Sequence, residues 1–343
     1  MISKRGFAFR VILRWSYHIM LLILVYNVFV ALLYHFSVLN VSMPWIPVSI
    51  LGTAVAFYVG FKNNQSYDRM WEARKIWGSI TNDSRSWAVA VMHMVTNSGD
   101  TNYTEEQLLE IKKHLIYRHI AWLYKLRKQL LVPTDWEHVS QKGFVGWRSK
   151  KGRIKYGIGR VAKEEERLNM LDFLTEEEMA HLSMKKNKAV HVIDMQTAEL
   201  AKLKKQGLLN DFCHVHMQKI LNNLYDYQGQ CERIKKFPLP RQYSNISTLW
   251  VAAFIMLIPF TVIPEMLHES PWYTLLAIII STLISAVYVT MENVGDYSEN
   301  PFEGMPNDIP MFSTCRSIEI DLREILGEKE VPPIIRAKDG ILM

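Results

Sequence analysis

Residues 45–61 read WIPVSILGTAVAFYVGF and contain no Asp, Glu, Lys or Arg. They close a longer charge-free stretch that begins at Trp15. A helix needs about 20 apolar residues to cross a bilayer, so this stretch is long enough for two spans. Polar residues and a proline interrupt it at 40–44. We therefore expect a first span at 15–38 and a second at 45–61, with Pro47 in the first turn of the second, where proline is tolerated.

Two later stretches, 246–264 and 272–291, meet the same criterion. Basic residues lie on one side of the four expected spans, and neither outer loop contains Lys or Arg. The basic flanks are Lys4, Arg5, Arg10, Arg14, Lys62, Arg69, Arg233, Lys235, Lys236 and Arg241. Because cytoplasmic loops carry the excess of Lys and Arg, the sequence predicts an integral membrane protein with four spans and both termini in the cytoplasm.

The composition of the 343 residues, with 49% hydrophobic residues and a formal net charge of +6, is ordinary for a soluble protein. The membrane signal lies in how charged and apolar residues segregate along the chain. The expected regions are 1–61 with the first two spans, 62–242 as a cytosolic helical region, 243–292 with the last two spans, and 293–343 as a cytosolic tail. The cysteines, Cys213, Cys231 and Cys315, all fall in expected cytosolic regions, which argues against a disulfide framework.

The polar middle region has helix signals. Capping boxes begin at Thr104 and Thr175, and residues 190–232 predict one or two helices joined near Gly207. Residues 134–165 differ, because they hold five glycines and a basic run. We interpret them as an irregular basic loop. It is either a solvated insertion or a contact to anionic lipid headgroups.

The second span carries a distinctive stripe. Thr53, Phe57 and Phe61 are four residues apart and share one helix face, while Gly52 and Gly60 let neighbouring helices approach closely. Repeated around an axis, the stripe would form apolar rings that gate by dewetting. The same spacing is also typical of packing between helices.

Charge is absent from the interior of the spans. Ion-coupled transporters usually carry ionisable groups there, so the sequence favours a passive pore, with a plain membrane anchor for a cytosolic domain as the alternative. No nucleophile elbow, Walker sequence, dinucleotide-binding turn or nucleic-acid signature is present. We therefore expect no enzyme, no cofactor and no nucleic-acid partner.

Two groups of motifs resemble the bestrophin channel family, in its bacterial branch. The first group is IPVS at 46–49, GFKNNQSYDR at 60–69 and WEARKIWG at 71–78; the second is ENPF at 299–302, NDIP at 307–310 and CRSIE at 315–319. The order of the motifs and the four-span layout agree with that family over most of the chain.

The resemblance implies an all-α homopentamer around one central pore in the bacterial inner membrane. Its partners would be permeant ions, membrane lipids and further copies of the chain. Animal members are calcium-activated chloride channels, so it favours an anion or chloride channel; a cation-selective channel of the same architecture is the alternative. It places the pore neck at Thr53, Phe57 and Phe61, and a second, cytosolic constriction at Phe212.

The calcium clasp of the animal proteins matches poorly. There a dense acidic run follows Asn-Pro-Phe, whereas here Asn300 and Asp308 are what remains of it. Calcium prefers six to eight oxygen ligands, and Met305 and Pro306 occupy positions where side-chain oxygens are needed. We expect no metal here and interpret the segment as a turn that packs the tail.

Overall fold

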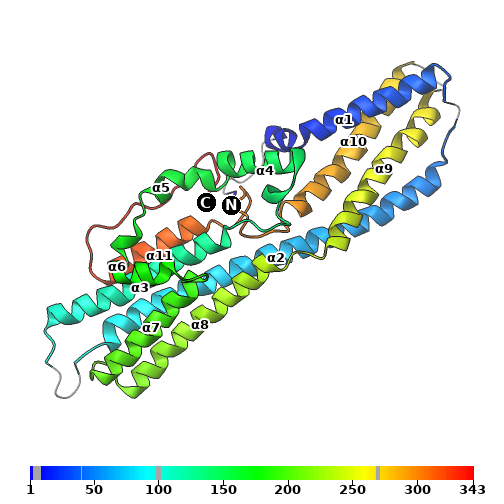
Figure 1. The fold of residues 1–343 in the computed structure, drawn as a ribbon. Coiled ribbons are helices and arrows are strands. Elements are labelled where there is room, and N and C mark those ends of the chain that lie inside the picture. The colour runs from blue at the N-terminus through cyan, green and yellow to red at the C-terminus, as the bar shows by residue number, and fades with distance from the viewer. Residues whose placement is uncertain (3–8, 40, 98–101, 268–270) are drawn as a thin grey trace. The chain divides into compact units, whose positions relative to one another are not determined.

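A computed structural model describes residues 1–2, 9–39, 41–97, 102–267 and 271–343 (Figure 1). Within them the regular secondary structure is helical, with two isolated β-bridges, which confirms the all-α prediction. Of the basic residues expected ahead of the first span, Lys4 and Arg5 lie outside the described residues. The side chains of Arg10 and Arg14 are likewise outside what the structure describes.

The helices fall into two compact units. The apolar unit comprises the described residues from Phe9 to Arg69 together with Pro238–Asn300. The polar unit comprises residues 1–2, Met70–Phe237 and Pro301–Met343. The apolar unit contains α1 (Phe9–His35), α9 (Arg241–Leu267), α10 (Pro271–Asp296) and the first part of α2 (Trp45–Met94). The polar unit contains the rest of α2, α3 (Glu105–Leu130), α4 (Gly143–Tyr156), α5 (Ala162–Glu166), α6 (Glu176–Ser183), α7 (Lys188–Lys205), α8 (Asp211–Lys236) and α11 (Met311–Ile325).

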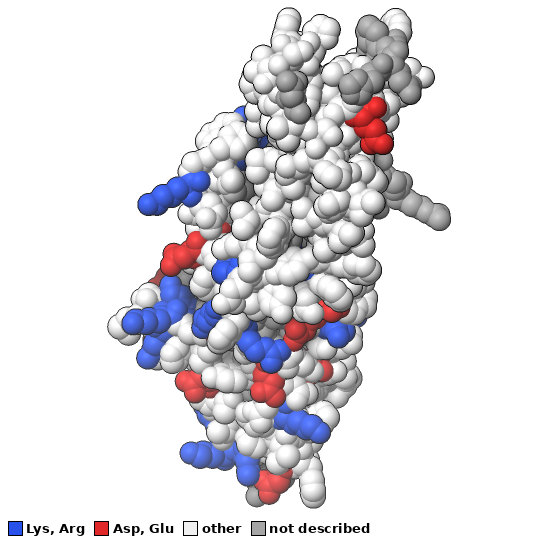
Figure 2. Space-filling view, turned by 90° about the vertical axis from the view of Figure 1, so that its right-hand side faces the viewer, with Lys and Arg blue, Asp and Glu red and all other residues white. Residues whose placement is uncertain are grey.

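Four helices in the described part of the chain are long and apolar enough to cross a membrane: Tyr17–His35, Trp45–Met94, Arg241–Leu267 and Trp272–Asp296. All four expected spans fall on them. The second span does not end at Phe61, because α2 continues as one helix of 50 residues. The face shown in Figure 2 includes a long stretch of surface with very few charged side chains.

The packed face of α2 in the apolar unit follows helical spacing. Val48, Val55 and Val59 are buried there and belong to a cluster with residues of α1, α9 and α10. A Cβ atom at Gly52 would lie 2.7 Å from Cζ of Phe254, so glycine is needed for this approach. The hydroxyl of Tyr288 donates to the carbonyl oxygen of Gly52 over 3.0 Å. The small size of Gly52 and this hydrogen bond therefore help to fix which face of α2 turns inward.

The polar unit confirms the helix signals of the middle region. Thr104 and Gln107 form a reciprocal capping box at the start of α3, and Thr175 and Glu178 do the same for α6. Gly207, with φ of +76°, separates α7 from α8. The left-handed conformation suits glycine because a side chain is disfavoured there.

The prediction of an irregular loop at 134–165 is wrong for most of its length. It contains two 3₁₀ turns (His138–Ser140 and Ile158–Val161), α4 and α5. Three of the five glycines that suggested a loop, Gly146, Gly157 and Gly159, serve close contacts instead. A Cβ atom at Gly146 would lie 1.7 Å from the carbonyl oxygen of Gln141, and one at Gly157 would lie 2.1 Å from that of Gly304.

Candidate functional site

The outward face of α2 carries the predicted stripe. Phe57 and Phe61 are 67% and 66% exposed, and Thr53 is exposed beside them. They lie opposite the packed valines and Gly52, as the spacing of four predicts. The structure thus brings these three residues together on one surface of the apolar unit, and that surface is not packed within the chain.

The hydroxyl of Thr53 is already used. It donates to the carbonyl oxygen of Ser49 over 3.0 Å, one turn earlier in the helix. Because its proton is bound within the helix, Thr53 offers the surface a methyl group and an oxygen acceptor. It cannot donate to an ion without breaking this bond.

Two polar residues continue the same face. Asn64 lies three residues after Phe61, and Asp68 lies four residues after Asn64. Both residues are exposed. Asp68 has no ion-pair partner among the described residues. Asp68 is not among the predicted site residues, because it lies beyond the expected end of the span at Phe61; the same spacing, extended through Arg69, points to it.

A buried ion pair secures the inner face of α2. Nζ of Lys62, whose residue is 1% exposed, lies 2.6 Å from Oε1 of Glu292 on α10. Ser247 and Thr248 of α9 donate their hydroxyls to the same carboxylate, over 2.6 and 2.8 Å. The carboxylate therefore connects three helices. Removing one partner of such a pair is costly, since it leaves an uncompensated buried charge.

A second carboxylate repeats the arrangement at Glu299. It accepts from Arg241 over 2.9 Å and from Ser244 over 3.2 Å, while Nε of Arg69 donates to the Glu299 carbonyl over 3.0 Å. Sequence reasoning missed both carboxylates as anchors. The available signal was an acidic residue after the fourth span and basic residues at the ends of the second and third.

Phe212 lies in the polar unit and is described there by itself. It sits in the first turn of α8 and is 90% exposed. The side chain of Asn210 caps the helix by accepting from the amide of Cys213. This cap fixes the start of the helix and leaves the phenyl ring of Phe212 projecting to the surface.

Asp308 organises a turn. Oδ1 accepts from the amides of Phe302 and Ile309 over 3.0 and 2.7 Å, and Oδ2 accepts from that of Gly304 over 2.7 Å. Burial raises the pKa of the Asp308 carboxyl above its usual range, and the three N–H donors oppose that rise. Phe302 and Gly304 have φ of +72° and +80°, so the carboxylate holds a tight, left-handed segment together.

The neighbouring carboxylate is engaged as well. Oε1 of Glu303 accepts from the amide of Val139, and Oε2 lies 3.0 Å from Nδ1 of His138. In the apolar unit, Asn300 contacts the carboxylate of Glu299 over 3.4 Å. Among the residues that the structure describes, no group of three or more His, Cys, Asp or Glu side chains could hold a metal ion.

Crystal structures of proteins with the same helical fold are known. A crystal structure of a bacterial bestrophin homolog from Klebsiella pneumoniae matches with a TM-score of 0.72 and 21% identity, covering 91% of this chain and 98% of that one. The voltage-dependent anion channel-forming protein YneE of Escherichia coli K12 is 25% identical to this chain over 294 residues, which are 86% of this chain and 81% of that protein. A voltage-dependent anion channel-forming protein of Nostoc is 24% identical over 317 residues, 92% of this chain and 87% of its own length.

The family comparison covers nearly the whole sequence. The profile described as "Bacterial/Fungal Bestrophin protein" matches residues 7–324, which include the apolar unit and most of the polar unit. The resemblance first noted in the motifs of α2 and of the segment after α10 is therefore confirmed, and the chain belongs to the bacterial and fungal bestrophin family.

Proposed function

We propose that this protein is a passive anion channel, with chloride as a permeant ion, and that it is not an enzyme. A homopentamer places α2 of each copy around one pore. Thr53, Phe57 and Phe61 form the neck and act as its gate. Phe212 lines a second constriction on the cytosolic side.

One observation carries the proposal: α2 leaves two phenyl rings two-thirds exposed directly opposite its packed face. In a closed ring of identical copies, the stripes of all copies can face the same symmetry axis. Stacked apolar rings resist ions because an ion must shed its hydration without replacement ligands. A membrane anchor for a signalling domain, the rival function, has no need of this surface.

The relatives support an anion channel, since those from Escherichia coli and Nostoc are named as voltage-dependent anion channel-forming proteins. The four long apolar helices support a multi-pass protein of the bacterial inner membrane. We propose that both termini are cytoplasmic, because the basic residues that flank these helices, such as Lys62 and Arg241, lie on one side of the expected topology.

Asp68 favours the alternative, a cation-selective channel of the same architecture. It lies on the outward face seven residues beyond Phe61, and rings of carboxylates select cations. Phenyl edges attract anions whereas phenyl faces attract cations. The presence of phenylalanine at the neck therefore does not by itself select anions over cations. The sign of the permeant ion follows from the balance between the neck and the Asp68 ring.

Membrane lipids are the further partners that we propose. The outward face of α4 carries Phe144, Trp147 and Ile154, all more than half exposed. Nζ of Lys151 lies 4.9 Å from the ring centroid of Trp147. The helix has five basic residues and no acidic one. Interleaved aromatic and basic groups suit the headgroup layer of an anionic leaflet.

The first prediction concerns ion sign and assembly. In an asymmetric potassium chloride gradient, the reversal potential of the reconstituted protein should follow chloride, and Asp68→Asn should increase the preference for anions by removing the carboxylate ring. The protein in detergent should have the mass of five chains. A reversal potential that follows potassium would support the cation alternative, and a monomer would exclude the pore.

A second prediction concerns calcium. Both oxygens of Asp308 and both of Glu303 already have partners within the chain, so micromolar calcium should not open the channel. Chloride flux from liposomes should be the same with calcium and with a chelator. Saturable activation by calcium would contradict the assignment of this segment as a turn.

The third prediction tests the neck. Phe57→Ala should widen and wet the pore and raise ion flux severalfold, while the pentamer remains intact in gel filtration. Phe254→Ala is the matched control, because this ring is buried against Gly52. Removing a phenyl ring from a packed core typically lowers the free energy of unfolding by about 3–5 kcal/mol. If Phe57→Ala disassembles the protein, or leaves flux unchanged, Phe57 is not part of the gate.

The fourth prediction tests lipid contact. Phosphatidylglycerol should raise the unfolding temperature of the detergent-purified protein more than phosphatidylcholine does. Replacing Lys150, Lys151 and Lys155 by Gln should abolish this difference. The control replaces Lys202, Lys205 and Lys219, which removes the same charge from α7 and α8. Equal behaviour of the two triple variants would exclude α4 as the lipid-binding surface.

A further inference from the structure

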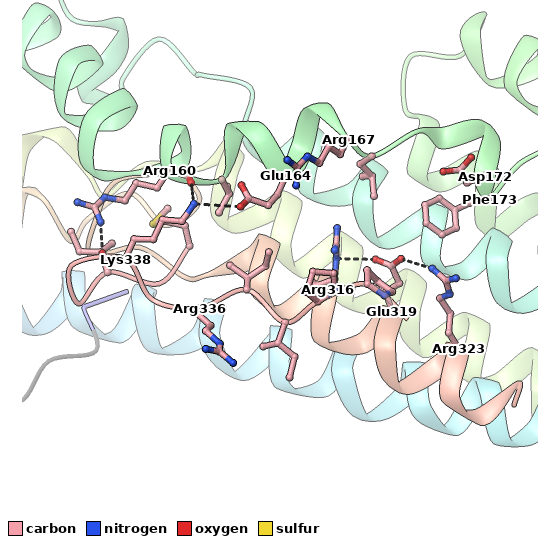
Figure 3. A pocket seen from close by; sticks show the side chains of 18 of the residues that line it. Arg160, Glu164, Arg167, Asp172, Phe173, Arg316, Glu319, Arg323, Arg336 and Lys338 are labelled. Carbon is pink, nitrogen blue, oxygen red and sulfur yellow. Dashed lines mark hydrogen bonds and ion pairs between the residues drawn. The ribbon is translucent and has the colours of Figure 1, made fainter. Parts of the chain in front are cut away.

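The polar unit contains a cavity of about 920 Å³ that plays no part in the proposed pore. It is lined by the segment from Arg160 to Phe173, by α11, and by the tail from Pro332 to Met343 (Figure 3). Binding sites for small molecules typically enclose about 300–1,000 Å³. The cavity is large enough for an organic ligand.

The lining has an excess of positive charge. Six Lys or Arg residues face three Asp or Glu residues. Some of the cations are neutralised locally: Lys338 lies 3.3 Å from Oε1 of Glu164, and Arg160 lies 3.0 Å from Oδ2 of Asp339. Arg167 has no ion pair with any residue that the structure describes, although it lowers the pKa of Glu164 through space. Positive charge is therefore available to a ligand.

Arg316 supplies a preorganised guanidinium. The residue is 8% exposed, its Nε lies 3.2 Å from Oε2 of Glu319, and its guanidinium lies over the ring of Phe312. Within the described part of the chain, its two terminal nitrogens have no hydrogen-bond partner. Figure 3 shows the side chains of Arg316 and Arg167 pointing toward one another from opposite sides of the cavity. Two facing guanidinium groups suit a group of charge −2, which each can bind bidentately.

The remaining wall is apolar and partly flat. Phe173, Pro332, Pro333 and Ile335 line the cavity, and the ring of Phe173 packs edge-on against Tyr117 with centroids 5.7 Å apart. Inorganic phosphate alone would leave this wall without contacts. A ligand that fills both parts of the cavity has an anionic head and a flat apolar body.

We propose that this cavity binds a small aromatic phosphate monoester, with the phosphate held between Arg167 and Arg316 and the ring against Phe173 and the prolines. The tail forms one wall and α11 forms another, so the ligand joins the two. The proposal is independent of the channel function, because none of its residues lies on the outward face of α2 in the apolar unit.

The test is a fluorescence titration of the full-length protein in detergent with 1-naphthyl phosphate, which should bind saturably at one site per chain. Inorganic phosphate and 1-naphthol should each bind at least about tenfold more weakly, because each lacks half of the recognised chemistry. Affinity for 1-naphthyl phosphate should fall as salt rises. Absence of saturable binding would refute the proposal, and equal binding of 1-naphthol would refute recognition by the arginines.

Arg167→Gln is the informative variant, since Arg167 is exposed and its loss breaks no ion pair. It should weaken binding of 1-naphthyl phosphate about tenfold. Arg74→Gln makes the same change at an exposed position of α2, outside the cavity, and should bind like the unmodified protein. An Arg167→Gln protein with unchanged affinity would overturn the assignment, and so would an equal loss in both variants.

Discussion

The ion pair between Lys62 and Glu292 controls how α2 sits in the apolar unit. The carboxylate also accepts from hydroxyls of Ser247 and Thr248, so one buried anion joins α2, α9 and α10. Charges removed from water are costly unless they are paired and hydrogen-bonded. Here the buried charges are paired and hydrogen-bonded when α2 is rotated about its axis so that Lys62 faces inward. The same rotation turns the phenyl rings of Phe57 and Phe61 outward.

The remaining features of the apolar unit follow from that setting. Gly52 allows the ring of Phe254 to approach α2, and Tyr288 secures the same turn by donating to its carbonyl oxygen. The helix then presents a packed face and an unpacked face along its apolar part. In the proposed channel, the packed face would hold each subunit together and the unpacked face would meet the pore.

In the polar unit, the corresponding contacts hold the tail from Pro332 to Met343 in place. Asp308 gathers three backbone amides of one turn. The terminal ammonium of Met1 donates to the carbonyl oxygen of Leu342 over 2.6 Å. These contacts leave α11 and the tail as two walls of the arginine-lined cavity. Carboxylates that could resemble a calcium site in the sequence are thus occupied by structural hydrogen bonds.

The sequence by itself determined the helical class, the apolar helices and the shared face of Thr53, Phe57 and Phe61, because segregation and spacing along one chain are local properties. It misread 134–165, because glycine marks close contacts as well as loops, and the contacts of Gly157 involve a residue far along the chain. Only the tertiary structure decided that Lys62 pairs with Glu292 and that Arg167 faces Arg316. The two residues of each set lie more than a hundred positions apart, and their arrangement depends on how helices pack rather than on any local pattern.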